Sequence, residues 1–133
     1  MSLHRLFPTI LVSVALVAPA FAQADGPYTD AQAARGKTAA LESCTSCHGG
    51  GLTGGEDAPP LTGSAFLGKW GKLPVSALFD FINTQMPLGA PGSLGAQTNA
   101  DITAYILSLS QVPAGQKELP PDAAALGNVI IKP

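Results

Sequence analysis

The chain has 133 residues, a length that suits one compact domain. Only 12% of the residues are charged and the formal net charge is −2, so the sequence provides no basic surface for binding nucleic acid. Aromatic residues make up 6% of the chain, which is little for a self-sufficient core. The 15 Gly and 12 Pro residues favour a loop-rich fold over a long helical bundle.

Residues 1–22 have the pattern of a secretory signal peptide. A weakly positive start precedes an apolar stretch at residues 10–17, and Ala20-Phe21-Ala22 forms a small-residue cleavage site. The apolar stretch is short for a transmembrane helix, although an uncleaved anchor stays open as an alternative. We therefore expect export to the periplasm, cleavage after Ala22 and no stable membrane span afterwards.

The first half of the mature chain is predicted to contain one helix and one long loop. Residues 23–28 are expected to be a flexible leader to a domain over residues 29–112. A helix is predicted over residues 30–43, with Thr29 as its N-cap. Residues 49–63, GGGLTGGEDAPPLTG, are too rich in Gly and Pro for a regular element and are expected to form a loop.

Two further helices are predicted in the second half of the domain. Pro74 suits the first turn of a helix that extends to about Asn83 and carries an apolar stripe at helical spacing. A third helix is predicted to begin at Thr98, with Asp101 in a capping-box-like position. Residues 113–133 are expected to be a Pro-rich C-terminal tail, and no sheet is expected.

The strongest chemical signal is Cys44-Thr45-Ser46-Cys47-His48, a C-x-x-C-H haem attachment motif. Two thiols at this spacing can form thioethers to the two vinyl groups of a haem, and the following imidazole then reaches the iron. A disulfide here would close only a very small loop. A thioredoxin-like pair would need a nearby βαβ pattern, and a zinc site would need a fourth ligand. We therefore predict one covalent haem c at Cys44 and Cys47, with His48 as a ligand of its iron.

The second iron ligand is predicted by elimination. Outside the predicted signal peptide the sequence contains one His and one Met, which are His48 and Met86. A His/Met pair is a common axial ligand set in electron-transfer cytochromes. Met86 precedes Pro87, and a residue before proline is biased away from helical geometry. The alternative is that Met86 only fills a gap in the core, which would leave one coordination position open.

These features make the chain similar to class I cytochromes c, in particular to the small bacterial periplasmic haem domains associated with quinoprotein dehydrogenases. The resemblance covers about residues 35–109. It is carried by Gly36, CTSCHG at 44–49, APPLTG at 58–63, Trp70, QMPLGAPGSL at 85–94 and DITAYIL at 101–107. It implies an all-α, cytochrome c-like fold in which three main helices and long loops are wrapped around one covalently bound haem.

The resemblance also implies roles for individual residues. The first and last helices would cross with Gly36 against Tyr105. The carbonyl group of Pro59 would accept a hydrogen bond from Nδ1 of His48 and so fix the imidazole ring. The indole N–H of Trp70 would reach a haem propionate. The alternatives are that Pro59 is an ordinary loop proline and that Trp70 is a core residue.

The expected function is that of an exported electron carrier, not an enzyme, which shuttles single electrons through a haem with His/Met ligation. Its expected partners are redox proteins, with a quinoprotein dehydrogenase and a terminal oxidase as candidates on resemblance alone. A haem subunit docked permanently to a periplasmic dehydrogenase is one alternative, and the long tail favours it. A haem-based sensor is another. A peroxidase-like haem enzyme is a third, although the sequence offers no cluster of distal His or Arg residues.

Overall fold

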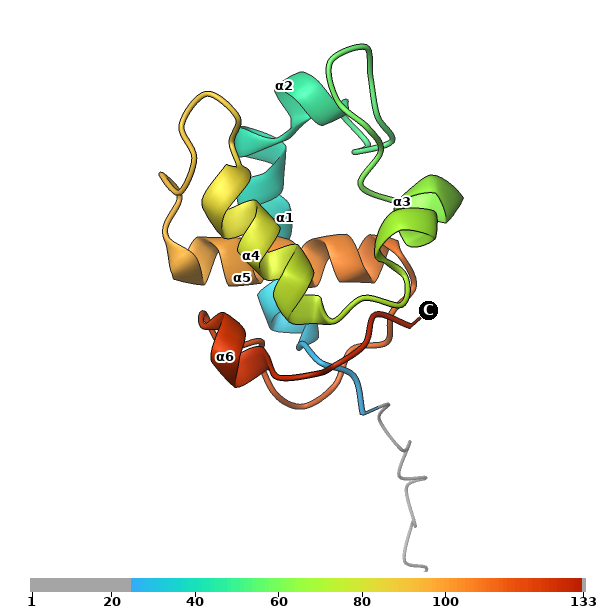
Figure 1. Cartoon of the computed structure of the whole chain (residues 1–133), viewed down its shortest axis with the longest axis vertical. Coiled ribbons are helices and arrows are strands. Elements are labelled where there is room, and N and C mark those ends of the chain that lie inside the picture. The colour runs from blue at the N-terminus through green and yellow to red at the C-terminus, as the bar shows by residue number, and fades with distance from the viewer. Residues whose placement is uncertain (1–24, 133) are drawn as a thin grey trace, which may run out of the picture.

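The computed structural model describes residues 25–132, so the predicted signal peptide lies outside the described residues. This part of the chain forms six helices: α1 (Asp30–Ser43), α2 (Thr45–His48), α3 (Gly63–Trp70), α4 (Val75–Gln85), α5 (Ala96–Leu109) and α6 (Ala123–Leu126). Within it, β pairing is limited to an isolated antiparallel bridge between Pro74 and Ile130. The all-α prediction is confirmed, and long loops connect the helices (Figure 1). None of the helices in residues 25–132 has the length and hydropathy needed to span a membrane.

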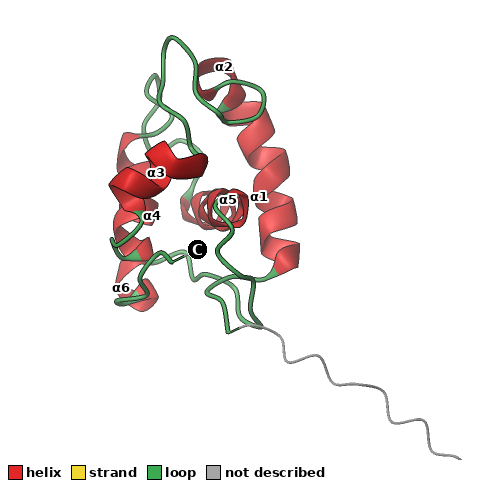
Figure 2. Cartoon of the chain, turned by 90° about the vertical axis from the view of Figure 1, so that its right-hand side faces the viewer, coloured by secondary structure: helices red, strands yellow, loops and turns green. Residues whose placement is uncertain are grey.

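Helix α1 has the bounds that its capping signal predicts. The hydroxyl group of Thr29 accepts a hydrogen bond from the backbone N–H of Gln32. Asp30 lies in the first turn, where a negative charge interacts favourably with the helix dipole. Helices α1 and α5 form the most extensive helix–helix contact of the structure. Figure 2 shows α5 end-on, with α1 on one side of it and α3 and α4 on the other.

A glycine allows the close approach of α1 and α5. A Cβ atom at Gly36 would collide with the backbone carbonyl group of Asp101 and the backbone nitrogen of Ile102. Only a residue without a side chain fits at this point of α1. The backbone atoms that face Gly36 lie one turn before Tyr105. Because helical side chains lean toward the preceding turn, the packing of Tyr105 against Gly36 stays a prediction.

The capping-box interpretation of Asp101 is wrong. Helix α5 begins at Ala96, two residues before the predicted start, and its N-cap is Gly95, which provides no side chain for capping. The Asp101 carboxylate instead accepts two hydrogen bonds from Arg35 on α1, at 2.9 Å from Nε and 3.1 Å from Nη2. The same guanidinium group lies 2.8 Å from Glu118 in the C-terminal segment. Arg35 therefore connects α1, α5 and the end of the chain.

Replacing Asp101 with Asn should make the free energy of unfolding depend less steeply on pH in the acid range. Burial raises the pKa of the Asp101 carboxyl group, but hydrogen bonds from Arg35 and Gln97 outweigh burial and hold the pKa below its ordinary value of 3.8. A group with a lowered pKa adds stability above its ordinary pKa, and this contribution is lost as the pH falls through the folded-state pKa. We expect Asp101→Asn to cost about 1 kcal/mol at pH 7, because Arg35 is half exposed. Urea unfolding at pH 7 and at pH 3 measures the difference, and an unchanged pH slope would contradict the prediction.

Helix α4 confirms the second predicted helix, with Pro74 at the N-cap position rather than inside the first turn. Its apolar stripe is buried as expected, at Val75, Leu78, Phe79 and Ile82. Helix α3 has no counterpart among the predicted helices. It buries Phe66 and Trp70, which lie one turn apart on the same face, while its glycines Gly63 and Gly68 weaken the sequence signal for a helix.

The segment after Pro113 packs against the helical domain. The buried side chain of Gln32 donates to the carbonyl oxygen of Leu119 at 3.0 Å and accepts from the N–H of Leu119 at 2.7 Å. The N–H of Val75 donates to the carbonyl oxygen of Val129 at 2.7 Å. Three apolar side chains of this segment are buried: Leu119, Leu126 and Ile131. The C-terminal segment therefore contributes to the core of the domain.

Candidate haem site

An apolar pocket of about 590 Å³ lies among the helices. Its lining comes from the α1–α2 junction, from α3, α4 and α5, and from the two loops around Pro59 and Met86. Most of the lining is hydrophobic, and it includes Leu61, Phe66, Ile82, Leu94, Ile102 and Ile106. The pocket also collects all six predicted site residues: Cys44, Cys47, His48, Pro59, Trp70 and Met86.

The two cysteines lie at the junction of α1 and α2. The N–H of Cys44 donates to the carbonyl oxygen of Ala40 at 2.9 Å, and the N–H of His48 donates to the carbonyl oxygen of Cys44 at 2.9 Å. This tight connection places Cys44 and Cys47 at one edge of the pocket, and their sulfur atoms are not bonded to each other. Burial, with a smaller effect from Cys47, raises the pKa of the Cys44 thiol. Redox-active thiol pairs usually have a lowered pKa, so the raised value disfavours a thioredoxin-like pair.

His48 is buried and its imidazole ring is held by the loop that follows the motif. Nδ1 of His48 lies 2.7 Å from the carbonyl oxygen of Pro59. When Nδ1 carries the proton and donates it to this oxygen, Nε2 has a free lone pair for a metal. The N–H of Gly54 in the loop donates to the carbonyl oxygen of His48, and within the loop the N–H of Leu61 donates to the carbonyl oxygen of Leu52. The loop therefore places Pro59 where it can orient the ring.

Met86 approaches the same pocket from the end of α4. Its N–H donates to the carbonyl oxygen of Ile82 at 3.1 Å, and its own carbonyl oxygen accepts from the N–H of Gly92 at 3.2 Å. The backbone of Met86 is extended, which releases its side chain from the helical direction. Met86 is partly buried and lines the pocket together with His48. One nitrogen donor and one thioether therefore line the same apolar space.

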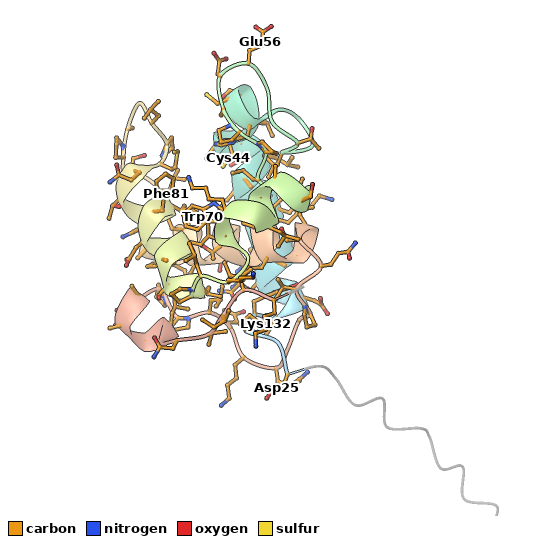
Figure 3. The ribbon with its side chains drawn as sticks, turned by 45° about the vertical axis from the view of Figure 1, so that its right-hand side comes forward. Asp25, Cys44, Glu56, Trp70, Phe81 and Lys132 are labelled. Atoms are coloured by element: carbon orange, nitrogen blue, oxygen red, sulfur yellow. The ribbon has the colours of Figure 1, made fainter. Side chains whose placement is uncertain are left out.

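An aromatic cluster from α3 and α4 lines part of the pocket. The Trp70 ring lies 6.4 Å from the Phe66 ring and 5.4 Å from the Phe81 ring, measured between centroids. Figure 3 shows Trp70 and Phe81 beside each other on these two helices. Phe81 and the neighbouring Lys69 also line the pocket, and neither was identified from the sequence. Phe81 lies three residues after Leu78, and this helical spacing could have predicted that Phe81 faces the same side of α4. No comparable pattern in the sequence indicates the position of Lys69.

The residues of the pocket fit a haem and do not fit a bare metal ion. In the described range, no three side chains among His, Cys, Asp and Glu gather in a way that could hold an ion. The pocket instead combines a wide apolar lining, two thiols at one edge, an imidazole and a thioether. This combination suits a covalently attached haem, because thiols form thioethers with its vinyl groups and an imidazole and a thioether are both ligands that haem iron accepts.

Comparison with known proteins gives the same result. Residues 31–106 match the family model described as cytochrome c oxidase, cbb3-type, subunit III. No curated protein matches the sequence. The crystal structure of the sulfane dehydrogenase SoxCD from Paracoccus pantotrophus is similar at 24% identity and a TM-score of 0.59. That similarity covers 74% of this chain and 52% of the SoxCD chain, so this protein spans about half the length of that relative, and it supports the fold alone. Because the family model covers more than half of the sequence, the chain belongs to the cytochrome c family described as cbb3-type oxidase subunit III, a family of electron-transfer proteins with covalently bound haem c.

Proposed function

We propose that this protein is an exported one-electron carrier whose haem iron is held by His48 and Met86. The observation that carries the proposal is that both side chains line one apolar pocket, with Cys44 and Cys47 at its edge. The two cysteines would form the thioethers to the haem, and Nε2 of His48 and the sulfur of Met86 would bind its iron. The bound haem supplies an iron that alternates between Fe(II) and Fe(III).

The residues around the proposed ligands favour electron transfer by the haem. The carbonyl oxygen of Pro59, at 2.7 Å from Nδ1, fixes the His48 ring and makes it a stronger ligand. The thioether of Met86 favours the reduced metal, and the apolar lining keeps water away, so both raise the reduction potential. With His48 and Met86 both bound to the iron, no coordination position would be left for substrate or oxygen. This occupancy distinguishes a carrier from a peroxidase-like enzyme.

Export and partner docking complete the proposal. The predicted signal peptide supports the periplasm as the site of action. Leu88 lies at the pocket and is 81% exposed, which provides an apolar contact for brief encounters with redox partners. Candidate partners are a quinoprotein dehydrogenase as donor and a terminal oxidase as acceptor. A haem subunit docked permanently to a dehydrogenase is the second candidate, because the fold is similar to part of a sulfane dehydrogenase chain. Isolating the native protein, alone or in a complex, separates the two.

Replacing Met86 with Ala should remove the second axial ligand. The oxidised wild type should show a weak near-infrared band from iron–sulfur bonding, and the variant should lose it and bind carbon monoxide when reduced. The midpoint potential should fall, within the range of about 0.8 V that axial ligands span in haem proteins. Visible and near-infrared spectra with a redox titration measure these changes.

Leu88→Ala is the matched control for this experiment, because Leu88 belongs to the same loop but is exposed. It should keep the near-infrared band and should not bind carbon monoxide. An unchanged spectrum in Met86→Ala would exclude Met86 as a ligand. Carbon monoxide binding by the wild type would favour an enzyme with an open coordination position.

A further inference from the structure

Lys69 provides the only Lys or Arg side chain in the lining of the haem pocket. Its Nζ atom lies 5.1 Å from the centroid of the Trp70 ring and 5.2 Å from the centroid of the Phe81 ring. Both distances fall in the range of cation–π contacts, which extends to about 6 Å. The two rings belong to different helices and lie 5.4 Å apart, so they hold the ammonium group at the junction of α3 and α4.

The chemistry of haem provides a partner for this cation. The two propionate carboxylates of a haem leave the ring on the side away from the vinyl groups. Cys44 and Cys47 would fix the vinyl side at the α1–α2 junction, whereas Lys69 belongs to α3, on the other side of α5 from α1 (Figure 2). The propionates would therefore be directed toward the part of the pocket that holds Lys69 and Trp70.

A carboxylate at an apolar pocket needs a compensating partner, because an unpaired charge is costly to remove from water. The other charged residue of the lining, Asp57, is an acid and would repel a propionate. Trp70 can donate one hydrogen bond from its indole N–H but carries no charge. Lys69 alone in this lining combines a positive charge with hydrogen-bond donors.

We propose that Lys69 is a positioning residue for the haem, whose ammonium group, held between Trp70 and Phe81, pairs with a haem propionate. This proposal rests on the proposed function, because it assumes a haem attached at Cys44 and Cys47. The paired cation neutralises a negative charge close to the iron. Since reduction adds an electron, a nearby positive charge favours Fe(II) and raises the midpoint potential.

The test compares three variants of the holoprotein: Lys69→Met, Lys69→Arg and Lys72→Met. Lys69→Met keeps an apolar side chain against the rings but removes the charge. Lys72→Met removes the same charge from a nearby exposed residue outside the pocket lining, so it controls for the change in net charge. Lys69→Arg keeps the charge, and an arginine also stacks well on aromatic rings.

We expect Lys69→Met to lower the Fe(II)/Fe(III) ratio about tenfold at a fixed applied potential, a shift of about 59 mV for a one-electron couple. Lys69→Arg should stay near the wild type. Lys72→Met should change the ratio less than about threefold, because Lys72 lies outside the pocket lining, where solvent and salt screen its charge from the haem. The propionate bending band in the resonance Raman spectrum should shift in Lys69→Met alone. A crystal structure of the holoprotein should place Nζ of Lys69 within about 3.2 Å of a propionate oxygen.

Equal potential shifts in Lys69→Met and Lys72→Met, or a holoprotein structure without the Lys69–propionate contact, would overturn this proposal. Neither result affects the proposed function, provided that the near-infrared band of Met86 ligation is present. The opposite result, a haem that lacks this band but responds to Lys69→Met, would overturn the His/Met assignment and support the role of Lys69. Thermal unfolding of each variant verifies that it is folded.

Discussion

The double variant Cys44→Ala/Cys47→Ala should lose its haem and with it most of its cooperative fold. Phe66, Leu78, Ile82, Ile102 and Ile106 belong to the buried core and also line the pocket of about 590 Å³. Without the haem, these side chains would border an open, water-accessible space. Small domains with a limited core commonly depend on a cofactor or a covalent link. We expect a loss of about 5 kcal/mol or more, comparable to the whole stability of a domain of this size.

Mass spectrometry, circular dichroism and urea unfolding test this expectation. The wild type should weigh more than its polypeptide by one haem, and the double variant should not. Ser46→Ala is the control inside the motif, since Ser46 is exposed between the two cysteines and should leave attachment intact. Native helix content together with a cooperative transition in the colourless double variant would contradict the prediction.

Features with a local signal could be predicted from the sequence. Helix α1 has a Thr29 N-cap and α4 has an apolar stripe, and both were predicted within two residues of their bounds. The predicted site residues Cys44, Cys47 and His48 lie within one short motif, and their spacing alone indicates the cofactor. Signals of this kind need no knowledge of distant contacts.

Features that depend on distant partners could not be predicted. Asp101 resembles a capping residue, but its partner Arg35 lies 66 residues earlier in the chain. The C-terminal segment reads as a Pro-rich tail, yet it is held by Gln32, which is 87 residues from Leu119. Tertiary contacts such as these override the local pattern.

The same limit applies to the site. Lys69 lies in a short helix whose glycines hide its periodicity, and its position over two rings depends on how α3 packs against α4. Met86 is predicted by elimination and Trp70 through the resemblance to class I cytochromes c, and neither argument carries information about the neighbours of these residues. The sequence therefore provided candidate haem-binding residues, and the fold was needed to find the cation beside them.

The second large effect is expected for Gly36→Ala at the crossing of α1 and α5. In a helix interior, replacing Gly with Ala normally adds about 1 kcal/mol of stability. At Gly36 the new Cβ atom would meet the backbone of Asp101 and Ile102, and backbone atoms cannot rotate away as a side chain can. The two helices must separate, and the Arg35–Asp101 ion pair beside the crossing would be stretched. We expect a net loss of about 3 kcal/mol in the free energy of unfolding.

Gly68→Ala provides the matched control, because Gly68 also lies inside a helix but is exposed and has open space around its Cβ position. This variant should gain about 0.5–1 kcal/mol from helix propensity. Urea unfolding of the two holoproteins, followed by circular dichroism, measures both changes. Because the same substitution should have opposite signs at the two sites, equal stabilities for the two variants would show that α1 and α5 do not cross at Gly36.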